Sequence, residues 1–330
     1  MLLAAVLACV GQPAPTGTLL MVSERDGAPA TWVIDADGSG LRRLAGPVGS
    51  TFPGEADPQG THALVVSALD PTDGPHREQL WLLPLDGSDA VALSPPAGKI
   101  RNPSWSEDGT WLAFESDAVS YRDLFRVDRD GSNRARLTDA PHGSFEPDVS
   151  KRIAFGTSRD GNAEIYTMTA DGADVRRLTE DPSDDVHPRW SADGEQLAWL
   201  SRRSGRPQVF VSDGHRSPRP LRPANPDAVD LDLAWSPSGD LLAVTVQTGK
   251  REVFIEIVEV ATGDIRATLD GDGPDEHPAW SPDGAWIAFS SSREGDPAVF
   301  VSTPQGTLTR RLGTGGVDWL PRWLNPAIGG

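Results

Sequence analysis

The chain has 330 residues, of which 38% are hydrophobic and 24% charged, and its formal net charge at pH 7 is −18. A nucleic-acid-binding protein carries a basic face, so this acidic balance argues against that class. The length fits two ordinary domains or one large repeat domain, and 34 Gly and 29 Pro residues supply the turns that many short strands require.

The chain begins with a short apolar run, Leu2 to Ala8, that ends at the only cysteine, Cys9. The sequence Val-Leu-Ala-Cys resembles a bacterial lipobox, in which the cysteine is lipidated, and the small residue before it suits signal-peptide cleavage. The run is short and no Lys or Arg precedes it, which a true start upstream of Met1 would explain; a frayed apolar terminus is the alternative. We expect residues 1–17 to be a signal or lipobox segment and linker. We also expect export to the periplasm, the outer membrane or the cell surface on a lipid anchor at Cys9.

From residue 18 onward, one segment recurs seven times at spacings of 41 to 49 residues. Periods of this length are typical of propellers and solenoids. The landmark of each copy is a tryptophan before a Ser-Pro-Asp-Gly-like turn, replaced by Ala or Val in two copies. In chain order the landmarks are Ala56, Trp105, Val149, Trp190, Trp235, Trp280 and Trp323.

Each landmark turn is followed by a short apolar strand and then by a strand of alternating character, as β structure predicts. The predicted apolar strands are Leu19–Val22, Ala63–Val66, Leu112–Phe114, Ile153–Phe155, Leu197–Trp199, Leu242–Val244 and Ile287–Phe289. The predicted alternating strands are Thr31–Ile34, Gln79–Leu82, Asp123–Arg126, Glu164–Thr167, Gln208–Val211, Val253–Glu256 and Ala298–Val301. A glycine turn, usually Asp-Gly, and a closing strand complete each copy.

Four strands joined by three turns make one propeller blade. The first copy lacks the strand that carries the landmark, whereas the last copy is followed by a spare one, Val317 to Trp323. We therefore predict an all-β fold in which residues 18–330 form a single seven-bladed propeller of four-stranded antiparallel blades. The C-terminal strand closes the ring and so removes exposed sheet edges. Six or eight blades remain as alternatives, because two copies lack the tryptophan.

The repeat resembles that of TolB-type β-propellers, with Trp-Ser-Pro-Asp-Gly at 280–284 and Ile-Ala-Phe at 287–289. The fourth copy is especially similar, with Ser-Arg-Asp-Gly at 158–161, Asp-Gly at 171–172 and Arg-Leu-Thr at 177–179. The resemblance covers about residues 18–324 and implies a periplasmic relative of the Tol-Pal envelope system. TolB carries an N-terminal domain that we expect to be absent, so we interpret the chain as TolB-like rather than as TolB. Similar repeats accompany the hydrolase domain of prolyl-oligopeptidase-type peptidases, which we also expect to be absent.

Polar residues gather just before the landmark tryptophans, five residues before them at one position and three at another. They are Asp185, Asp230, Asp275 and Asp318 at the first position, and Glu146, His187, Asp232 and His277 at the second. Side chains two apart on a strand point the same way, which predicts an acidic, His-containing channel mouth that binds a cation, a sugar or a basic peptide. Trp319 is expected to lie exposed nearby, where it could stack on a sugar.

The alternative is that the recurring aspartates are structural, since residues that build blades must recur in every blade. The recurring Arg of the Ser-Arg-Asp-Gly turns is expected to pair with carboxylates between blades. These residues are Arg25, Arg159, Arg203 and Arg293.

The sequence contains no catalytic signature such as Gly-x-Ser-x-Gly or His-Glu-x-x-His. It therefore predicts an exported, non-catalytic scaffold that binds an envelope protein or a saccharide, with no nucleic-acid partner, as a monomer. No cofactor is expected, with a divalent cation as the open alternative. The rival hypotheses are a metal-dependent polysaccharide lyase or hydrolase that uses the channel, and a purely structural envelope component.

Overall fold

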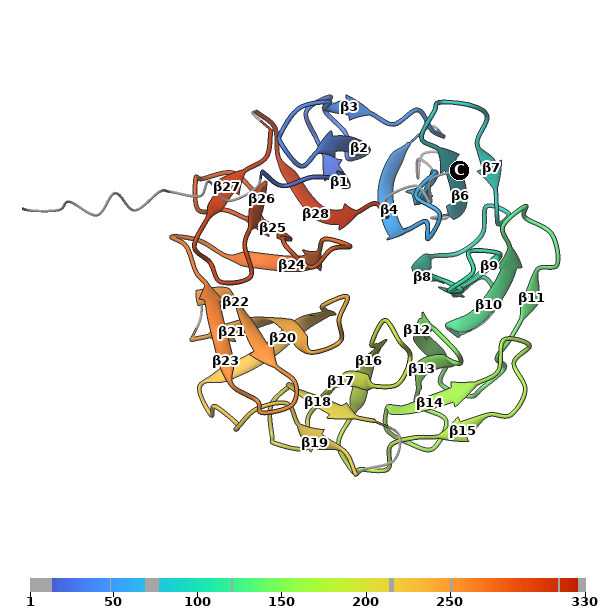
Figure 1. Cartoon of the computed structure of the whole chain (residues 1–330). Coiled ribbons are helices and arrows are strands. Elements are labelled where there is room, and N and C mark those ends of the chain that lie inside the picture. Colours follow the sequence, from blue (N-terminus) through green and yellow to red (C-terminus); the bar gives the residue numbers. More distant parts are fainter. Residues whose placement is uncertain are drawn as a thin grey trace, which may run out of the picture.

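The computed structural model describes residues 14–47, 49–68, 77–119, 121–213, 217–249, 252–313 and 315–325. In these ranges, seven four-stranded antiparallel sheets surround a central axis as a β-propeller (Figure 1). The predicted all-β fold and the count of seven blades are confirmed. No helix in the described ranges is long and apolar enough to cross a membrane. The predicted lipobox at Cys9 lies outside the described residues.

The strands follow the chain around the ring, four to a blade. Blade 1 contains β28 (Asp318–Trp323), β1 (Thr18–Ser23), β2 (Ala30–Asp35) and β3 (Arg42–Arg43); blade 2 contains β4 (Ser50–Ala56), β5 (His62–Ala68), β6 (Glu78–Pro84) and β7 (Val91–Ala92); blade 3 contains β8 (Ile100–Trp105), β9 (Trp111–Ser116), β10 (Asp123–Asp128) and β11 (Ala135–Arg136); blade 4 contains β12 (Ser144–Val149), β13 (Ile153–Thr157), β14 (Glu164–Met168) and β15 (Arg176–Arg177). Blade 5 contains β16 (Asp185–Trp190), β17 (Leu197–Ser201), β18 (Gln208–Ser212) and β19 (Arg219–Pro220); blade 6 contains β20 (Ala228–Trp235), β21 (Leu241–Thr248), β22 (Glu252–Glu259) and β23 (Ile265–Leu269); blade 7 contains β24 (Asp275–Trp280), β25 (Ile287–Ser291), β26 (Ala298–Ser302) and β27 (Thr309–Arg311).

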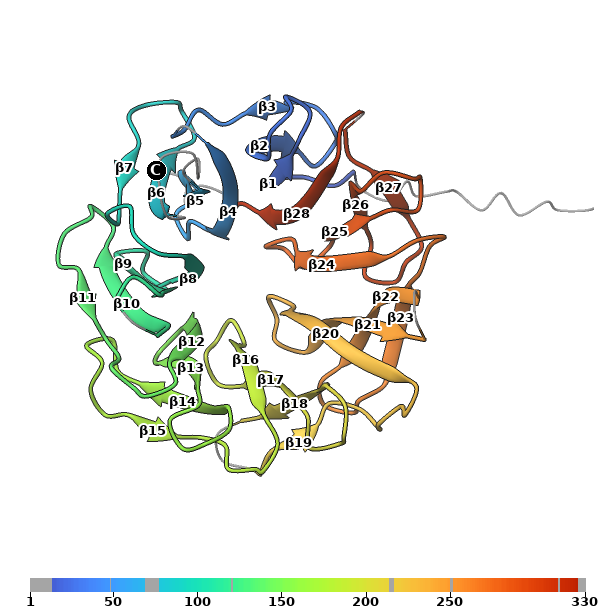
Figure 2. The same ribbon diagram turned by 180° about the vertical axis from the view of Figure 1, so that it is seen from behind.

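The ring closes where the two ends of the propeller meet. β28 pairs antiparallel with β1, so that Leu19 lies opposite Trp323 and Ser23 opposite Asp318. Figures 1 and 2 show the red β28 beside the blue β1, and the first strand of every blade points toward the central axis. The predicted closure by the C-terminal strand is therefore confirmed.

The hydrophobic core lies between the blades. Each buried cluster joins residues of two neighbouring blades, and the clusters together follow the whole ring. At the closing junction, Leu19 and Trp323 of blade 1 pack with Val299 of blade 7. Because apolar burial is the main favourable term in folding, the blades depend on their neighbours for stability.

The landmark tryptophan is explained by this packing between blades. The indole Nε1 of Trp280 donates a hydrogen bond to the carbonyl oxygen of Ala234 in the preceding blade, at 3.1 Å. Trp323 and Trp235 make the equivalent bonds to Ala279 and Arg189, at 3.0 and 2.9 Å. Tryptophan suits these three positions because it combines a large apolar surface with one donor that finds a partner when buried; the indole N–H groups of Trp105 and Trp190 have no partner among the described residues.

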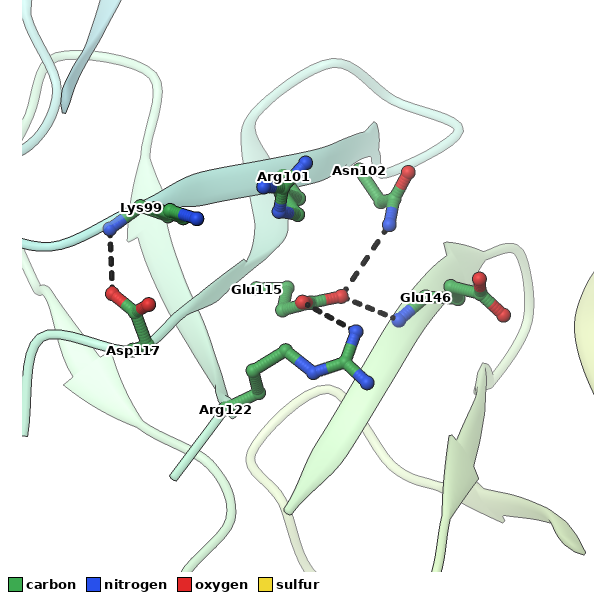
Figure 3. A pocket seen from close by; sticks show the side chains of 7 residues that line it. All are labelled: Lys99, Arg101, Asn102, Glu115, Asp117, Arg122 and Glu146. Carbon is green, nitrogen blue, oxygen red and sulfur yellow. Dashed lines mark hydrogen bonds and ion pairs between the residues drawn. The ribbon is translucent and has the colours of Figure 1, made fainter. Parts of the chain in front are cut away.

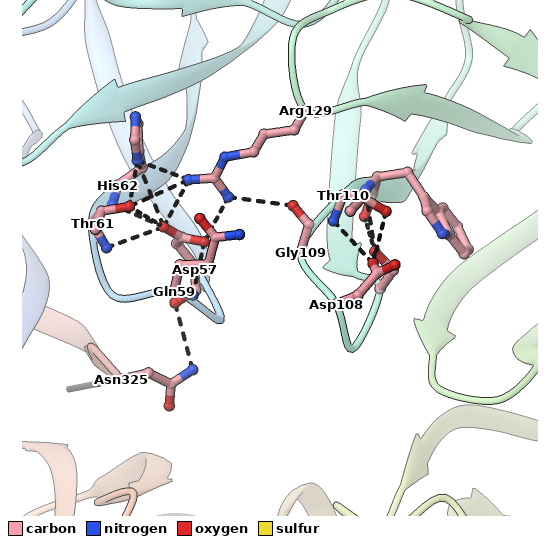
Figure 4. Close-up of polar contacts among 11 residues, drawn as sticks. Asp57, Gln59, Thr61, His62, Asp108, Gly109, Thr110, Arg129 and Asn325 are labelled. Carbon is pink, nitrogen blue, oxygen red and sulfur yellow. Dashed lines mark hydrogen bonds and ion pairs between the residues drawn. The ribbon is translucent and has the colours of Figure 1, made fainter. Parts of the chain in front are cut away.

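The turn after the landmark is held by a serine in most blades and by Asp57 in blade 2. Ser281 shows the common form: its Oγ accepts the N–H of Trp286 at 2.9 Å. Asp57 takes the equivalent position and accepts the backbone N–H groups of Gln59, Thr61 and His62 (Figure 4).

The same carboxylate also links two blades. Both terminal nitrogens of Arg129, from blade 3, donate to Asp57 at 2.7 and 2.9 Å. Burial alone would raise the pKa of Asp57, but the hydrogen bonds from Arg129 and from the turn amides hold it well below its usual range. Asp57 is thus an ionised and fully satisfied bridge between blades 2 and 3.

A β-bulge interrupts the first strand of most blades. In β16 the pairing with β17 shifts between Val186 and Arg189, and His187 between them has a φ of 60°. The residues at the same position in four other blades also have left-handed φ values; they are Asn102, Glu146, His277 and Leu320. Side chains other than glycine rarely adopt such values, so a repeated bulge indicates a fixed feature of this propeller.

Candidate functional site at the axis of the ring

The four aspartates five residues before the landmarks are buried, with exposed fractions of 0 to 3%. In blade 7, Arg293 donates to Asp275 at 2.7 Å and to Ser291 at 2.9 Å. Arg203 binds Asp185 in blade 5 in the same way, and Arg25 binds Asp318 in blade 1. Three of the four predicted arginines therefore pair with carboxylates, but within a blade and not, as expected, between blades. Arg159 instead lies over the rings of Phe155 and Tyr166.

Asp230 differs in its partners but not in its burial. Its two carboxylate oxygens accept from Arg222 at 2.8 and 3.0 Å, and one of them also accepts the N–H of Val209 at 2.8 Å. The expectation that Asp185, Asp230, Asp275 and Asp318 form an accessible rim is not supported by these contacts. The physical reason is the β-bulge in the first strand of these blades. Strict alternation would place an aspartate and the residue two positions later on the same side of the strand, but the bulge lies between them and separates them.

The residues three before the landmarks do approach one another around the axis. Glu146, His187 and Asp232 come from three successive blades, on β12, β16 and β20. The Nε2 of His187 is hydrogen-bonded to Oδ1 of Asp232 at 3.1 Å. Glu146 accepts the backbone N–H of His187 at 2.7 Å, and its other oxygen lies 3.9 Å from the imidazole Nδ1. Their side chains remain 20 to 31% exposed.

His277 belongs to the same tier on β24, but its contacts differ. Its buried Nδ1 has no hydrogen-bond partner among the described residues. Burial lowers the pKa of His277, whereas the pKa of His187 is raised because Asp232 and Glu146 outweigh burial and Arg189. The pKa of Asp232 falls to about 2, because its hydrogen bond and charge interaction with His187 outweigh burial. The two carboxylates thus favour the protonated form of His187, whereas burial favours the neutral form of His277.

A second tier, which the sequence analysis missed, comes from the residues immediately before the landmarks. It contains Glu55, Asp148, Arg189 and Arg322, from four blades. Each acid in this tier accepts a hydrogen bond from the backbone N–H of the landmark tryptophan in the next blade. Glu55 accepts from Trp105 at 2.8 Å, and Asp148 accepts from Trp190 at 2.7 Å.

The charges of this tier act on one another across the ring. Burial lowers the pKa of Arg322, and the charges of Asp232, Arg189 and Glu55 also act on it, although all four residues lie in different blades. We call the two tiers the axial cluster: Glu55, Glu146, Asp148, His187, Arg189, Asp232, His277 and Arg322. The position before the landmark is occupied by unlike residues from blade to blade, so repetition offered no signal for it.

The axial cluster offers cations, carboxylates and one neutral imidazole within a small region, which suits the recognition of polar and charged groups. In the part of the chain that the structure describes, no three His, Cys, Asp or Glu side chains are arranged to hold a metal ion.

Trp319 lies on β28 opposite Val22 and is half-buried. Sequence reasoning thus found four of the eight axial residues.

Glu55 gives the axial cluster a measurable pH dependence. Glu55 remains exposed to water, but the neighbouring blades surround its carboxylate and partly desolvate it. This desolvation, and then repulsion from Asp148, raises the pKa of Glu55 from 4.5 to about 7. The folded state then binds the Glu55 proton more tightly than the unfolded state. Ionised Glu55 therefore destabilises the fold increasingly as pH rises from 4.5 to about 7, and the full destabilisation is reached above that range. Glu55→Gln keeps an oxygen for the Trp105 N–H but removes the charge.

We expect Glu55→Gln to stabilise the protein by about 1 kcal/mol at pH 8, a value reduced for the water that reaches this exposed side chain. The gain should shrink toward pH 4.5. Urea unfolding at pH 8, 6.5 and 5 measures it, with Glu107→Gln, an exposed glutamate, as the control. A gain that does not change with pH would contradict this assignment.

Known proteins resemble this chain in sequence over part of its length. A family model described as the TolB beta propeller domain matches residues 137–218, which include blade 4 and the first three strands of blade 5. A TolB homolog of Chlorobium luteolum is 30% identical over 149 residues, which cover 45% of this chain and 33% of the homolog. The Tol-Pal system protein TolB of Desulfosudis oleivorans is 33% identical over 121 residues, or 36% of this chain and 26% of that protein. The matches thus span about a quarter to a third of these relatives.

Solved structures resemble the whole ring. TolB from Acinetobacter baumannii superposes with a TM-score of 0.59 at 17% identity, covering 94% of this chain and 80% of that one. An oligogalacturonate lyase in complex with manganese gives 0.68 at 18% identity, covering 87% and 86%. The periplasmic gluconolactonase of Pseudomonas aeruginosa gives 0.63 at 17% identity, covering 94% and 99%. At these identities the similarity establishes the fold alone, which proteins of different activities share.

Proposed function

We propose that this chain, whose repeats match the TolB beta propeller domain over residues 137–218, is a TolB-like, non-catalytic scaffold that binds a partner of the bacterial cell envelope at its axial cluster. The observation that carries the proposal is the cluster itself. Charged side chains from five blades meet there without being fully buried, and Asp232, His187 and Arg189 keep 31, 20 and 26% of their side-chain surface exposed. A rigid ring that presents side chains from many blades at one place is well suited to recognition.

The family relationship supports the envelope as the location. Relatives that share these repeats carry the name Tol-Pal system protein. The proposal places the protein in the periplasm, with residues 1–17 as the export segment, Cys9 as a lipid attachment site and residues 18–330 as one propeller domain. The preferred partner is an envelope protein, with a saccharide as the second possibility, and the protein acts as a monomer.

The proposal is tested by measuring partner capture with matched charge variants. The axial variant carries Arg189→Gln, Asp232→Asn and Arg322→Gln. The control carries Arg134→Gln, Asp139→Asn and Arg202→Gln, three exposed residues outside the axial cluster with the same change in charge. We expect the axial variant to lose at least about tenfold in affinity for a captured envelope protein, equivalent to about 1.4 kcal/mol, and the control to lose none. Equal capture by both variants would refute the assignment of the site.

The metal-dependent lyase or hydrolase and the purely structural component rest on similarity of fold alone. No contact or charge in the described residues favours either one, so neither is proposed.

A further inference from the structure

A polar cavity of about 500 Å³ opens between blades 3 and 4, outside the axial cluster except at its edge, where Glu146 contributes to both (Figure 3). Three cations line it: Lys99 and Arg101 at the start of blade 3, and Arg122 directly before β10. Cavities of this volume accommodate small molecules. In a chain with a net charge of −18, three cations around one cavity call for an explanation.

The acids of this cavity are already occupied by the protein. Glu115 is 1% exposed and accepts from Arg122 at 3.2 Å, from the Asn102 side chain at 3.3 Å and from the backbone N–H of Glu146 at 3.0 Å. Asp117 accepts the backbone N–H of Lys99 at 2.5 Å. In Figure 3 the carboxylate of Glu146 points away from the other lining residues, and it binds His187 instead.

The cations, in contrast, retain binding capacity. Within the described ranges, neither the ammonium group of Lys99 nor the guanidinium of Arg101 forms an ion pair or hydrogen bond, and both residues are exposed. Arg122 uses one nitrogen for Glu115 and is 50% exposed. Figure 3 shows Lys99 and Arg101 on the β8 side of Glu115 and Arg122 on the opposite side.

We propose that this cavity binds the carboxylate groups of an acidic ligand, held by Lys99 and Arg101 with support from the free nitrogens of Arg122. Guanidinium groups bind carboxylates in a planar, two-bond geometry. The buried Glu115 positions Arg122 and keeps the cavity walls fixed, while the Asn102 and Glu146 contacts join the walls from two blades. The proposal does not depend on the axial cluster binding any partner.

The carboxylates could belong to a small free acid or to an acidic segment of a larger molecule, and two peptides separate these sources. Triglutamate, acetylated at its N-terminus and amidated at its C-terminus, is the free probe, and triglutamine blocked in the same way is its counterpart of the same shape without a carboxylate. A 15-residue Gly/Ser peptide with three central Glu residues is the segment probe. Binding is measured with the full chain by calorimetry at low salt and again at 0.5 M salt, because such contacts weaken with ionic strength.

We expect triglutamate or the segment probe to bind, triglutamine not to bind, and Arg101→Gln and Lys99→Gln each to weaken binding by at least about tenfold. Arg134→Gln, an exposed arginine at the other end of blade 3, should leave it unchanged. Because both cavity residues are exposed, their variants should keep the melting temperature of the parent. Absence of binding by both acidic probes, equal binding of triglutamine, or equal loss in Arg134→Gln would each overturn the proposal.

Discussion

A chain that ends after residue 316, and so lacks β28, should lose most of its stability. Blade 1 would lose its innermost strand, and Leu19 of β1 would lose its partner Trp323, which is 5% exposed. Removing a large buried aromatic costs about 3–5 kcal/mol by itself, and here a whole strand of pairing is lost with it. Since domains are stable by only about 5–15 kcal/mol, we expect a loss of at least about 5 kcal/mol and no cooperative unfolding transition.

The matched control ends after residue 325, which keeps all of β28. Calorimetry and urea unfolding compare the two chains. If the chain that ends at residue 316 melted cooperatively at the temperature of the control, closure by β28 would not be what holds the ring together.

Asp57→Ala should be the most damaging single substitution at the turns. It leaves the backbone N–H groups of Gln59, Thr61 and His62 without their acceptor, and it leaves the Arg129 guanidinium, 20% exposed, without its carboxylate. Breaking a buried ion pair from one side costs about 3–5 kcal/mol, and we expect a loss in that range in urea unfolding at pH 7.

Asp57→Ser is the informative partner variant, because serine occupies this position in blades 3 to 7. Serine can accept the turn amides but cannot bind Arg129, so it should cost about half as much. The pKa of Asp57 is lowered in the folded state, so its stabilisation is present above pH 4 and declines as pH falls below its unfolded value. The parent and Asp57→Ser should therefore converge in stability toward pH 2. A serine variant as stable as the parent would show that Arg129 contributes nothing, and one as unstable as Asp57→Ala would show that the turn amides contribute nothing.

The fold could be predicted from the sequence because its determinants repeat. Trp280 and its equivalents mark the contact between blades, and glycines such as Gly284, with a φ of 70°, mark the turns. Each of these sequence features recurs at a similar spacing in several copies. The copies at Ala56 and Val149, which lack the tryptophan, could therefore be recognised from the spacing of the copies on either side.

The candidate site was only partly predictable, because two of its determinants do not repeat in that way. The bulge at His187 and its equivalents has no residue signature, since Asn, Glu, His and Leu all occupy it. Strict alternation therefore grouped Asp185 with His187, although the structure buries the first against Arg203 and leaves the second at the axis. Glu55 and Arg322 were missed because their importance depends on charges in other blades.

The central claim is that a partner binds at the axis of the ring, and photo-crosslinking tests it most directly. A benzoylphenylalanine at position 320, in the axial strand β28, should crosslink to a defined envelope protein, and an excess of unlabelled parent protein should suppress the product. The same probe at position 308, an exposed leucine beside the outer strand of blade 7, should give no such product. Crosslinking from position 308 alone, or equally from both positions, would contradict the account.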